Sequence, residues 1–211
     1  GASMEGEAKE AFAAIPGLSA VSAVATYGDD YSVDPAHACA IHGANGALSC
    51  WGEGDHGELG IGPVNAPVPT PTPVAIPNGE AIVSVAVGRE FTCAVSAPGS
   101  VYCWGSNGSG QLGDGSVTQR TVPVPILTVA DAVEVAAGGA HTCARRRDGT
   151  VLCWGANFSG QLGDGTTTQR LTPTVVPSLT NVAGLSAGGS HTCARRTARP
   201  HRRRAATSSR P

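Results

Sequence analysis

One sequence unit recurs along this chain about every fifty residues, and this period limits the folds that the chain can adopt. A period of roughly 20–50 residues is typical of repeat proteins, in which each unit buries its apolar face only by packing on its neighbours. The segment 103–123 aligns without a gap to the segment 153–173, and a more divergent copy begins near residue 37. The sequence therefore predicts three complete units and the beginning of a fourth.

Each unit contains short alternating segments and no helical periodicity. In the third unit, residues 133–135, 141–144 and 151–154 have strand patterns, and a turn at Asp148-Gly149 joins the second pattern to the third. After a loop rich in Gly, Asp and Thr, the Pro-containing segment 172–176 is expected to be an edge strand, because Pro cannot donate a backbone hydrogen bond to a ladder. Three or four short strands per unit are what one blade of a β-propeller needs.

The order of motifs in the third unit resembles the repeat of the regulator of chromosome condensation family. It reads His-Thr-Cys-Ala, then Asp-Gly, then Val-Leu-Cys-Trp-Gly, then Gly-Gln-Leu-Gly-Asp-Gly, all within residues 141–165. The resemblance covers about residues 20–196 and implies an all-β propeller, which in this family usually closes seven blades into a ring. Because the chain supplies about three and a half blades, we expect a partial or open propeller.

The expected organisation has three parts. Residues 1–19 form a lead-in segment that starts with a cloning remnant, residues 20–196 hold the blades, and residues 197–211 form a basic tail that is expected to be disordered. The blades are expected at 20–76, 81–126 and 131–177, with a partial blade at 182–196. No apolar run approaches the ~20 residues that span a bilayer, and the first residues do not resemble a secretory signal.

Two cysteines occupy each complete unit, ten or eleven residues apart. Turn length determines which residues of a hairpin face each other, and counting outward from the turns at 43–46, 97–99 and 147–149 brings each pair face to face. Directly opposite residues in a non-hydrogen-bonded pair are close enough for a disulfide. The predicted disulfides are Cys39 to Cys50, Cys93 to Cys103, and Cys143 to Cys153.

The seventh cysteine, Cys193, is predicted to be a free thiol, because Arg203 stands where its partner would be. Three disulfides would indicate an extracellular or cell-surface location, and the alternative is reduced core cysteines in a cytosolic protein. Structural zinc is not expected, since its cysteine ligands usually come in pairs two to four residues apart and this chain has no such pair.

Several aromatic and imidazole side chains recur at equivalent positions. The histidines could be metal ligands around a ring, but Phe91 stands in the same place in the second unit, and we expect them to bond loop backbone between blades. The tryptophans suit the space between blades, with sugar stacking as the alternative. The residues expected to have these structural roles are Trp51, Trp104, Trp154, His37, His141 and His191.

The loops that follow Trp-Gly differ from unit to unit and are the candidate binding loops. Each of the two later loops offers one carboxylate, which is too few for calcium, so turn formation explains their composition better. Neither loop has the lysine of a phosphate-binding loop. We expect no metal and no cofactor. The candidate binding residues are Asn107, Gln111, Asp114, Asn157, Phe158, Gln161 and Asp164.

The function expected from these features is a non-catalytic scaffold that binds a protein through its loops. A repeat duplicates its residues, whereas a catalytic site usually needs unlike groups that meet once, so we expect no enzyme. The alternatives are a secreted lectin or cell-wall binder and a guanine-nucleotide exchange factor, the activity of the best-known member of the resembled family.

The expected partner is a protein, with carbohydrate as a second choice. Nucleic acid is not expected, because the arginine-rich tail contains no Phe, Tyr or Trp and the repeats carry few basic residues. Self-association of two copies could cover the open blade faces and sheet edges, which are liabilities for a monomer.

Overall fold

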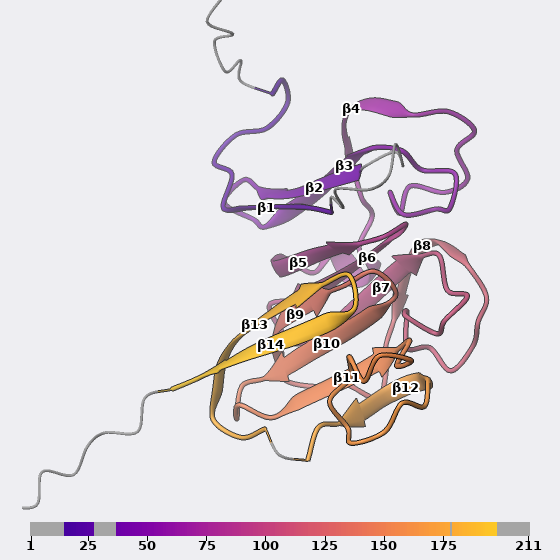
Figure 1. Cartoon of the computed structure of the whole chain (residues 1–211). Coiled ribbons are helices and arrows are strands. Elements are labelled where there is room, and N and C mark those ends of the chain that lie inside the picture. Colours follow the sequence, from indigo (N-terminus) through magenta and orange to yellow (C-terminus); the bar gives the residue numbers. More distant parts are fainter. Residues whose placement is uncertain (1–14, 28–36, 178, 198–211) are drawn as a thin grey trace, which may run out of the picture.

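The computed structural model describes residues 15–27, 37–177 and 179–197, which form successive antiparallel sheets (Figure 1). Three sheets have four strands in chain order, and the last has two. The first blade comprises β1 (Ala23–Thr26), β2 (His37–His42), β3 (Ala47–Gly52) and β4 (Val68–Pro73). The second comprises β5 (Ile82–Gly88), β6 (Phe91–Ser96), β7 (Val101–Gly105) and β8 (Arg120–Pro125).

The third blade comprises β9 (Ala132–Ala137), β10 (His141–Arg146), β11 (Val151–Gly155) and β12 (Arg170–Val175). The partial fourth blade has β13 (Val182–Gly188) and β14 (His191–Arg196). A 3-10 turn at Pro77–Gly79 links the first two blades. This arrangement confirms the predicted all-β fold of about three and a half propeller blades, and the described sheets do not close into a ring.

The first strands of successive blades, β1, β5, β9 and β13, contact one another, so each sheet runs outward from this inner row. The outermost strands, β8 and β12, contain Pro123, Pro125 and Pro173. Proline has no backbone N–H to donate, and an edge strand tolerates this because one of its sides has no partner strand. The edge strand predicted at 172–176 therefore corresponds to β12, which begins and ends slightly earlier.

The hairpin turns have the predicted lengths. Arg146 N donates to Thr150 O at 2.9 Å, and Gly149 between them has a φ of 81°, a value that glycine adopts without a steric penalty. The turn in the second blade is equivalent, with Ser96 N donating to Ser100 O at 2.9 Å, and in the first blade His42 faces Ala47. The second and third strands of each complete blade therefore pair in the predicted register.

This register places the two cysteines of each complete blade opposite each other. Disulfides join all three pairs, with Cα atoms 4.1 Å apart in each: Cys39 with Cys50, Cys93 with Cys103, and Cys143 with Cys153. Cys193 in β14 is exposed and free. Each disulfide lies within one blade, so the blades are joined by their linkers and by non-covalent packing.

The apolar core lies mainly between blades. Leu59 of the first blade packs in one cluster with Trp104 and Tyr102 of the second, and Leu112 of the second packs in one cluster with Trp154 of the third. Trp104 and Trp154 have no exposed surface, which agrees with the prediction that tryptophan fills the space between blades. No helix among the described residues has the length and apolar character that crossing a membrane would require.

Mass spectrometry tests the disulfides. Alkylation of the denatured, unreduced protein is expected to label one of its seven cysteines, Cys193, and labelling after reduction should reach all seven. Each disulfide closes a short loop, for which the chain-entropy estimate is about 3 kcal/mol of stabilisation, so the reduced protein should also unfold at a lower temperature. Seven labels before reduction would contradict both the pairing and an oxidising location.

Candidate functional site

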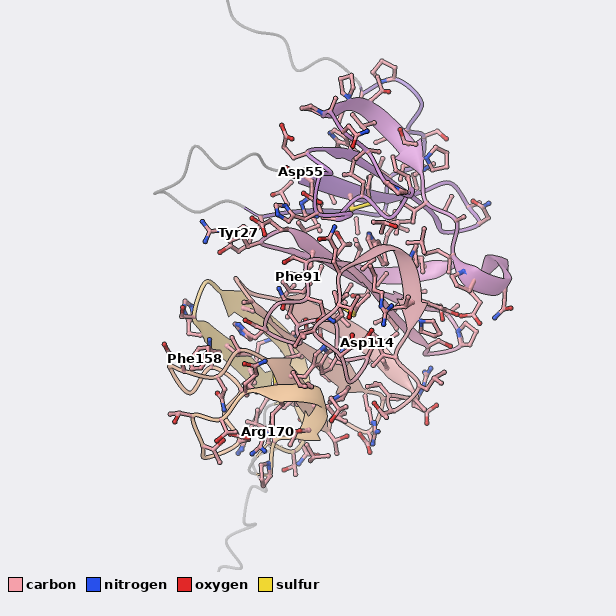
Figure 2. All side chains as sticks on the ribbon, turned by 90° about the vertical axis from the view of Figure 1, so that its right-hand side faces the viewer. Tyr27, Asp55, Phe91, Asp114, Phe158 and Arg170 are labelled. Atoms are coloured by element: carbon pink, nitrogen blue, oxygen red, sulfur yellow. A yellow bond between two sulfur atoms is a disulfide. The ribbon has the colours of Figure 1, made fainter. Side chains whose placement is uncertain are left out.

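The candidate binding loops follow the third strand of each blade, at residues 53–67, 106–119 and 156–169 (Figure 2). Each of the first two loops reaches the outer strand of the next blade. Gly62 N donates to Thr121 O at 2.9 Å, and Gly115 N donates to Leu171 O at 3.0 Å. The loops and the beginnings of β8 and β12 therefore form one continuous surface, called the loop face below.

A buried asparagine organises each of the two later loops. Asn157 is fully buried, and its Nδ2 donates to Asp164 Oδ1 and to the carbonyl oxygens of Thr166 and Thr168 at 3.0–3.1 Å. Its Oδ1 accepts from Leu162 N at 3.0 Å. Asn107 makes the equivalent bonds in the second blade. One side chain thus fixes both ends of the loop.

An aspartate closes each of these loops through an ion pair. Asp164 Oδ2 lies 2.8 Å from Arg170 Nη2, and Asp114 Oδ2 lies 2.7 Å from Arg120 Nη2. The hydroxyl of Thr166 donates to Asp164 and, with Thr166 N, Arg170 and Asn157, holds the pKa of Asp164 far below its usual range despite burial. Burial opposes the shift at Asp114, but bonds from Ser116 and Arg120 lower that pKa as well.

In each loop, the side chain of a glutamine or glutamate shapes the turn that follows the third strand of the blade. Gln111 Oε1 accepts from Ser109 N at 2.8 Å, and Gln161 Oε1 accepts from Ser159 N at 2.9 Å. In the first blade Glu58 Oε2 accepts from His56 N at 2.9 Å. The three side chains are buried, so they act within the loop.

The backbone carbonyl of the same residue joins one blade to the next. Glu58 O accepts from Trp104 Nε1 at 2.8 Å and from Thr92 Oγ1 at 2.9 Å, both in the second blade. Gln111 O accepts from Trp154 Nε1 at 2.9 Å and Thr142 Oγ1 at 2.8 Å, both in the third blade. Two donors from the following blade therefore meet one carbonyl oxygen of the preceding loop, an arrangement called the carbonyl joint below.

Two of the repeated histidines meet a threonine of the next blade. His37 Nε2 lies 2.8 Å from Thr92 Oγ1, and His141 Nε2 lies 2.8 Å from Thr192 Oγ1. These two histidines do bond between blades, but the expected partner was wrong, because each meets a threonine hydroxyl and not loop backbone. Burial lowers the pKa of His37 to about 4; burial and the neighbouring His191 lower the pKa of His141 to about 4. His191 itself is exposed in β14.

The structure separates the candidate binding residues into two groups. Asn107, Gln111, Asn157 and Gln161 are buried and bonded within their loops, and Asp114 and Asp164 are tied to arginines. A direct contact with a partner would require exposed side chains, so these residues support the loop face and do not present themselves on it. Phe158 differs from the other six, because 72% of its surface is exposed.

Phe158 occupies the tip position of its loop, and the other two blades carry different residues there. Alignment on Gly-Gln-Leu-Gly places Asp55 of the first loop and Gly108 of the second at this position. The Asp55 side chain is 63% exposed, and a Cβ added to Gly108 would meet nothing within 4 Å. The three tips therefore present a carboxylate, bare backbone and a phenyl ring, and Figure 2 shows the first and the last of them.

Sequence reasoning did not single out a cluster at the first tip. One ligand atom each from Asp55, His56 and Glu58 lies within 4.8 Å of the others, a spacing compatible with a metal ion. Glu58 is buried, which raises its pKa, and its carboxylate accepts the backbone bond that shapes the turn. The geometry thus has a structural explanation, and the expectation that no metal binds stays a prediction.

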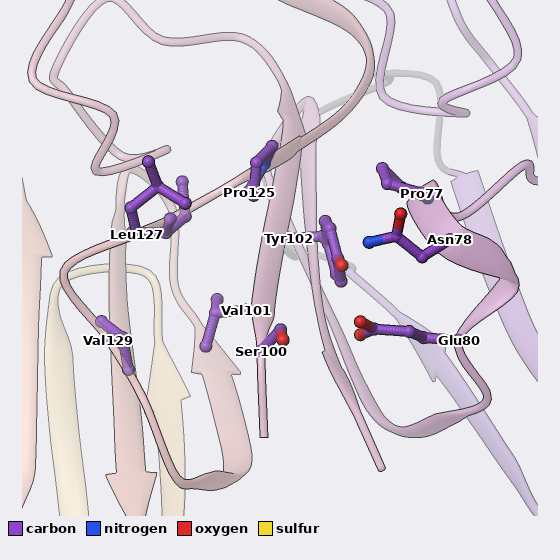
Figure 3. Close-up of a pocket in the computed structure, with 10 residues that line it drawn as sticks. Pro77, Asn78, Glu80, Ser100, Val101, Tyr102, Pro125, Leu127 and Val129 are labelled. Atoms are coloured by element: carbon purple, nitrogen blue, oxygen red, sulfur yellow. The ribbon is translucent and has the colours of Figure 1, made fainter. Parts of the chain in front are cut away.

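A separate cavity of about 350 Å³ lies beside the turn of the second blade (Figure 3). The side chains of Asn78 and Glu80 point toward the buried Tyr102, whose pKa is raised by burial and by Glu80. The Tyr102 hydroxyl is therefore protonated at neutral pH and acts as a hydrogen-bond donor. The equivalent positions hold Ser49 in the first blade and Leu152 in the third, so the phenol occurs once at this place in the three complete blades.

Together the blades, the carbonyl joints and the loop face define a β-propeller repeat protein. The regulator of chromosome condensation (RCC1) repeat matches residues 45–95, 98–145 and 148–195, and a second description of the same repeat matches residues 82–111 and 132–161. These matches cover more than half of the chain, which therefore belongs to the RCC1 repeat family.

Known proteins resemble this chain over part of their length. The protein RCC2 homolog of Xenopus laevis is 40% identical over 91 residues, which are 41% of this chain and 17% of that protein. Human WBSCR16 has a TM-score of 0.72 at 23% identity, covering 84% of this chain and 45% of that one. Prp20p of Saccharomyces cerevisiae has a TM-score of 0.68 at 23% identity, covering 75% and 41%. This chain thus spans less than half of each relative, and the structural likeness shows the fold.

Glycine substitutions test the carbonyl joint. A Cβ added to Gly113 would lie 2.6 Å from Trp154 Nε1, whereas at the equivalent Gly163 the nearest atom would be 3.6 Å away. Both glycines have positive φ, so Gly113→Ala and Gly163→Ala share the backbone cost of about 1 kcal/mol. Overpacking should destabilise Gly113→Ala by about 2 kcal/mol more, measured by urea unfolding. Equal losses would show that the indole does not fill this space.

Acid should weaken the protein through its buried histidines. Because the folded-state pKa of His37 and His141 is about 4, below the usual 6.5, the unfolded chain binds more protons between these values. The histidine contribution to the free energy of unfolding is therefore fully present above pH 6.5 and is lost as the pH drops toward 4. The loss is about 2 kcal/mol per histidine between pH 7 and pH 5.

The double substitution His37→Phe with His141→Phe provides the test, since Phe91 occupies the same position in the second blade. Unfolding temperatures of the variant should change less with pH over this window than those of the original protein. Parallel curves would contradict the assignment.

Proposed function

We propose that this chain is a non-catalytic scaffold that binds a macromolecular partner, most simply a protein, through its loop face. The observation that carries the proposal is the contrast between a repeated loop framework and an exposed, variable tip. The framework residues are buried and bonded in the same way in the second and third blades, while the tips of the three loops carry Asp55, Gly108 and Phe158. Rigid elements that present different side chains are suited to recognition.

Phe158 is the strongest contact residue on this surface. A phenyl ring that is 72% exposed costs free energy in water, and aromatic residues are enriched in the centres of protein interfaces. The solved structure of yeast Prp20p was described with its binding to Gsp1p and histones, so an array of this fold can recognise proteins. That precedent supports a protein partner here without identifying it.

The tryptophans offer little support for a lectin. Trp104 and Trp154 have no exposed surface, so neither can stack on a sugar, and Trp51 is half-buried. The three disulfides support an oxidising compartment, and we propose an extracellular or cell-surface location. A nucleotide-release assay distinguishes the scaffold from an exchange factor, and a glycan array distinguishes it from a carbohydrate binder. The scaffold should neither accelerate nucleotide release nor bind a glycan.

Photo-crosslinking tests the loop face. With benzoylphenylalanine at position 158, we expect a covalent adduct with one protein from the native source. The control position is 127, because Leu127 is 88% exposed but lies beside the cavity of Figure 3 and away from the tips.

Once the adduct is identified, Phe158→Ala should weaken binding of the purified partner by about tenfold or more, as expected for an aromatic anchor. Leu127→Ala should leave affinity unchanged. Equal adducts from both positions would contradict the proposal.

A further inference from the structure

Among the residues that the structure describes, no strand pairs with the outer edge of β14. In the complete blades the second strand pairs on both sides, as β10 does with β9 and β11, whereas β14 pairs with β13 alone among the described strands. One row of backbone donors and acceptors on β14 is therefore open to an added strand. Cys193, the free thiol, lies in the middle of this edge.

The space that a tryptophan of the next blade fills beside the first and second loops is unfilled beside the third loop. A Cβ added to Gly60 or Gly113 would meet the indole of the next blade at 2.6 Å, but at Gly163 no indole atom lies within 4 Å. Of the two donors found at the other carbonyl joints, the described residues provide Gln161 O with Thr192 Oγ1 alone, at 2.9 Å. The third carbonyl joint is thus half formed.

A cavity of about 380 Å³ lies at this place. Six of its apolar lining residues are Val151, Cys153, Leu162, Val176, Leu179 and Ala194. Fifty residues earlier, their counterparts pack in one cluster with Trp154 and Leu152: Val101, Cys103, Leu112, Ile126, Val129 and Ala144. The apolar lining of the cavity therefore comes from the same repeat positions as that of an occupied tryptophan site.

The sequence of this chain does not provide the missing side chains. The residues fifty positions after Cys153, Trp154 and Gly155 are Arg203, Arg204 and Ala205. A guanidinium group is a poor occupant of this site, because the polar residues that line it, Ser159, Gln161, Ser190, His191 and Thr192, include no carboxylate to pair with the charge. An indole, with a large apolar surface and one N–H donor, has the required chemistry.

We propose that the edge of β14 and the adjoining cavity form a docking site for an extended segment with the sequence Cys-Trp-Gly, supplied by a repeat strand of another polypeptide. By the register of β10 and β11, its glycine would lie opposite His191, its tryptophan opposite Thr192 and its cysteine opposite Cys193. The indole N–H would complete the bonding of Gln161 O. The cavity is lined on one side by residues 159–163 of the third loop, but Phe158 is not among its lining residues. Phe158→Ala and Gly163→Ala therefore test the two proposals separately.

A peptide probe tests the site by thiol exchange. The peptide has the sequence of residues 150–156, Thr-Val-Leu-Cys-Trp-Gly-Ala, with its cysteine activated as a disulfide to 2-thiopyridine. The Cys193 thiolate attacks the peptide sulfur, a protein–peptide disulfide forms, and 2-thiopyridine leaves as the thiolate, whose absorbance gives the rate. Docking should make this reaction at least about tenfold faster than with the Trp→Ala peptide, through a raised effective concentration.

Gly163→Ala is the matched variant, because its methyl group would enter the space of the indole while only Val176 lies near it at 3.6 Å. This variant should lose the preference for the tryptophan peptide yet react at an unchanged rate with free dithiodipyridine, which reports the intrinsic reactivity of Cys193. Circular dichroism of Gly163→Ala should match that of the original protein.

A second measurement removes the covalent step. A fluorescently labelled peptide with Cys→Ser should bind Cys193→Ser protein in anisotropy titrations, and the Trp→Ala form should not. Equal exchange rates for the two activated peptides, or a preference that survives Gly163→Ala, would overturn the proposal and leave Cys193 as an exposed thiol without a docking site.

Discussion

The arrangement of the blades depends on one carbonyl oxygen per blade. At residues 58 and 111 this oxygen accepts hydrogen bonds from both an indole N–H and a threonine hydroxyl of the next blade. Both indoles, those of Trp104 and Trp154, are fully buried. A buried carbonyl without donors would be costly, and so would a buried indole N–H, so each blade satisfies polar groups that its neighbour cannot satisfy alone. The side chain of the same residue shapes the loop, which couples the loop face to the packing between blades.

The sequence was sufficient to predict the hairpins and cysteine pairs, because both depend on local geometry. A turn of known length fixes the register, and the Gly at the end of the turn specifies its conformation, so Cys143 had to face Cys153. The period and the Trp-Gly motif likewise predicted the blades and the burial of Trp104 and Trp154.

The roles of the loop residues could not be read in the same way. Asn107 and Asn157 are polar and lie in loops, as binding residues do, and only the folded loop shows that their amides are enclosed by its own carbonyl groups. The threonine that meets each histidine is about fifty residues away in sequence, in the next blade. A usable signal was nevertheless present: the second and third loops share Asn, Gln and Asp at the framework positions, whereas an exposed position changes from Asp55 to Gly108 to Phe158.

The disulfides have a consequence for how arrays of this kind change in length. Each bridge spans ten or eleven residues and closes within a single blade. Gain or loss of a whole repeat would therefore leave every other bridged cysteine with its own partner, and duplication of a gene segment would add a complete covalent unit. A blade of two strands has a different effect: as described for β13 and β14, it presents a thiol, an open strand edge and an unfilled indole site side by side.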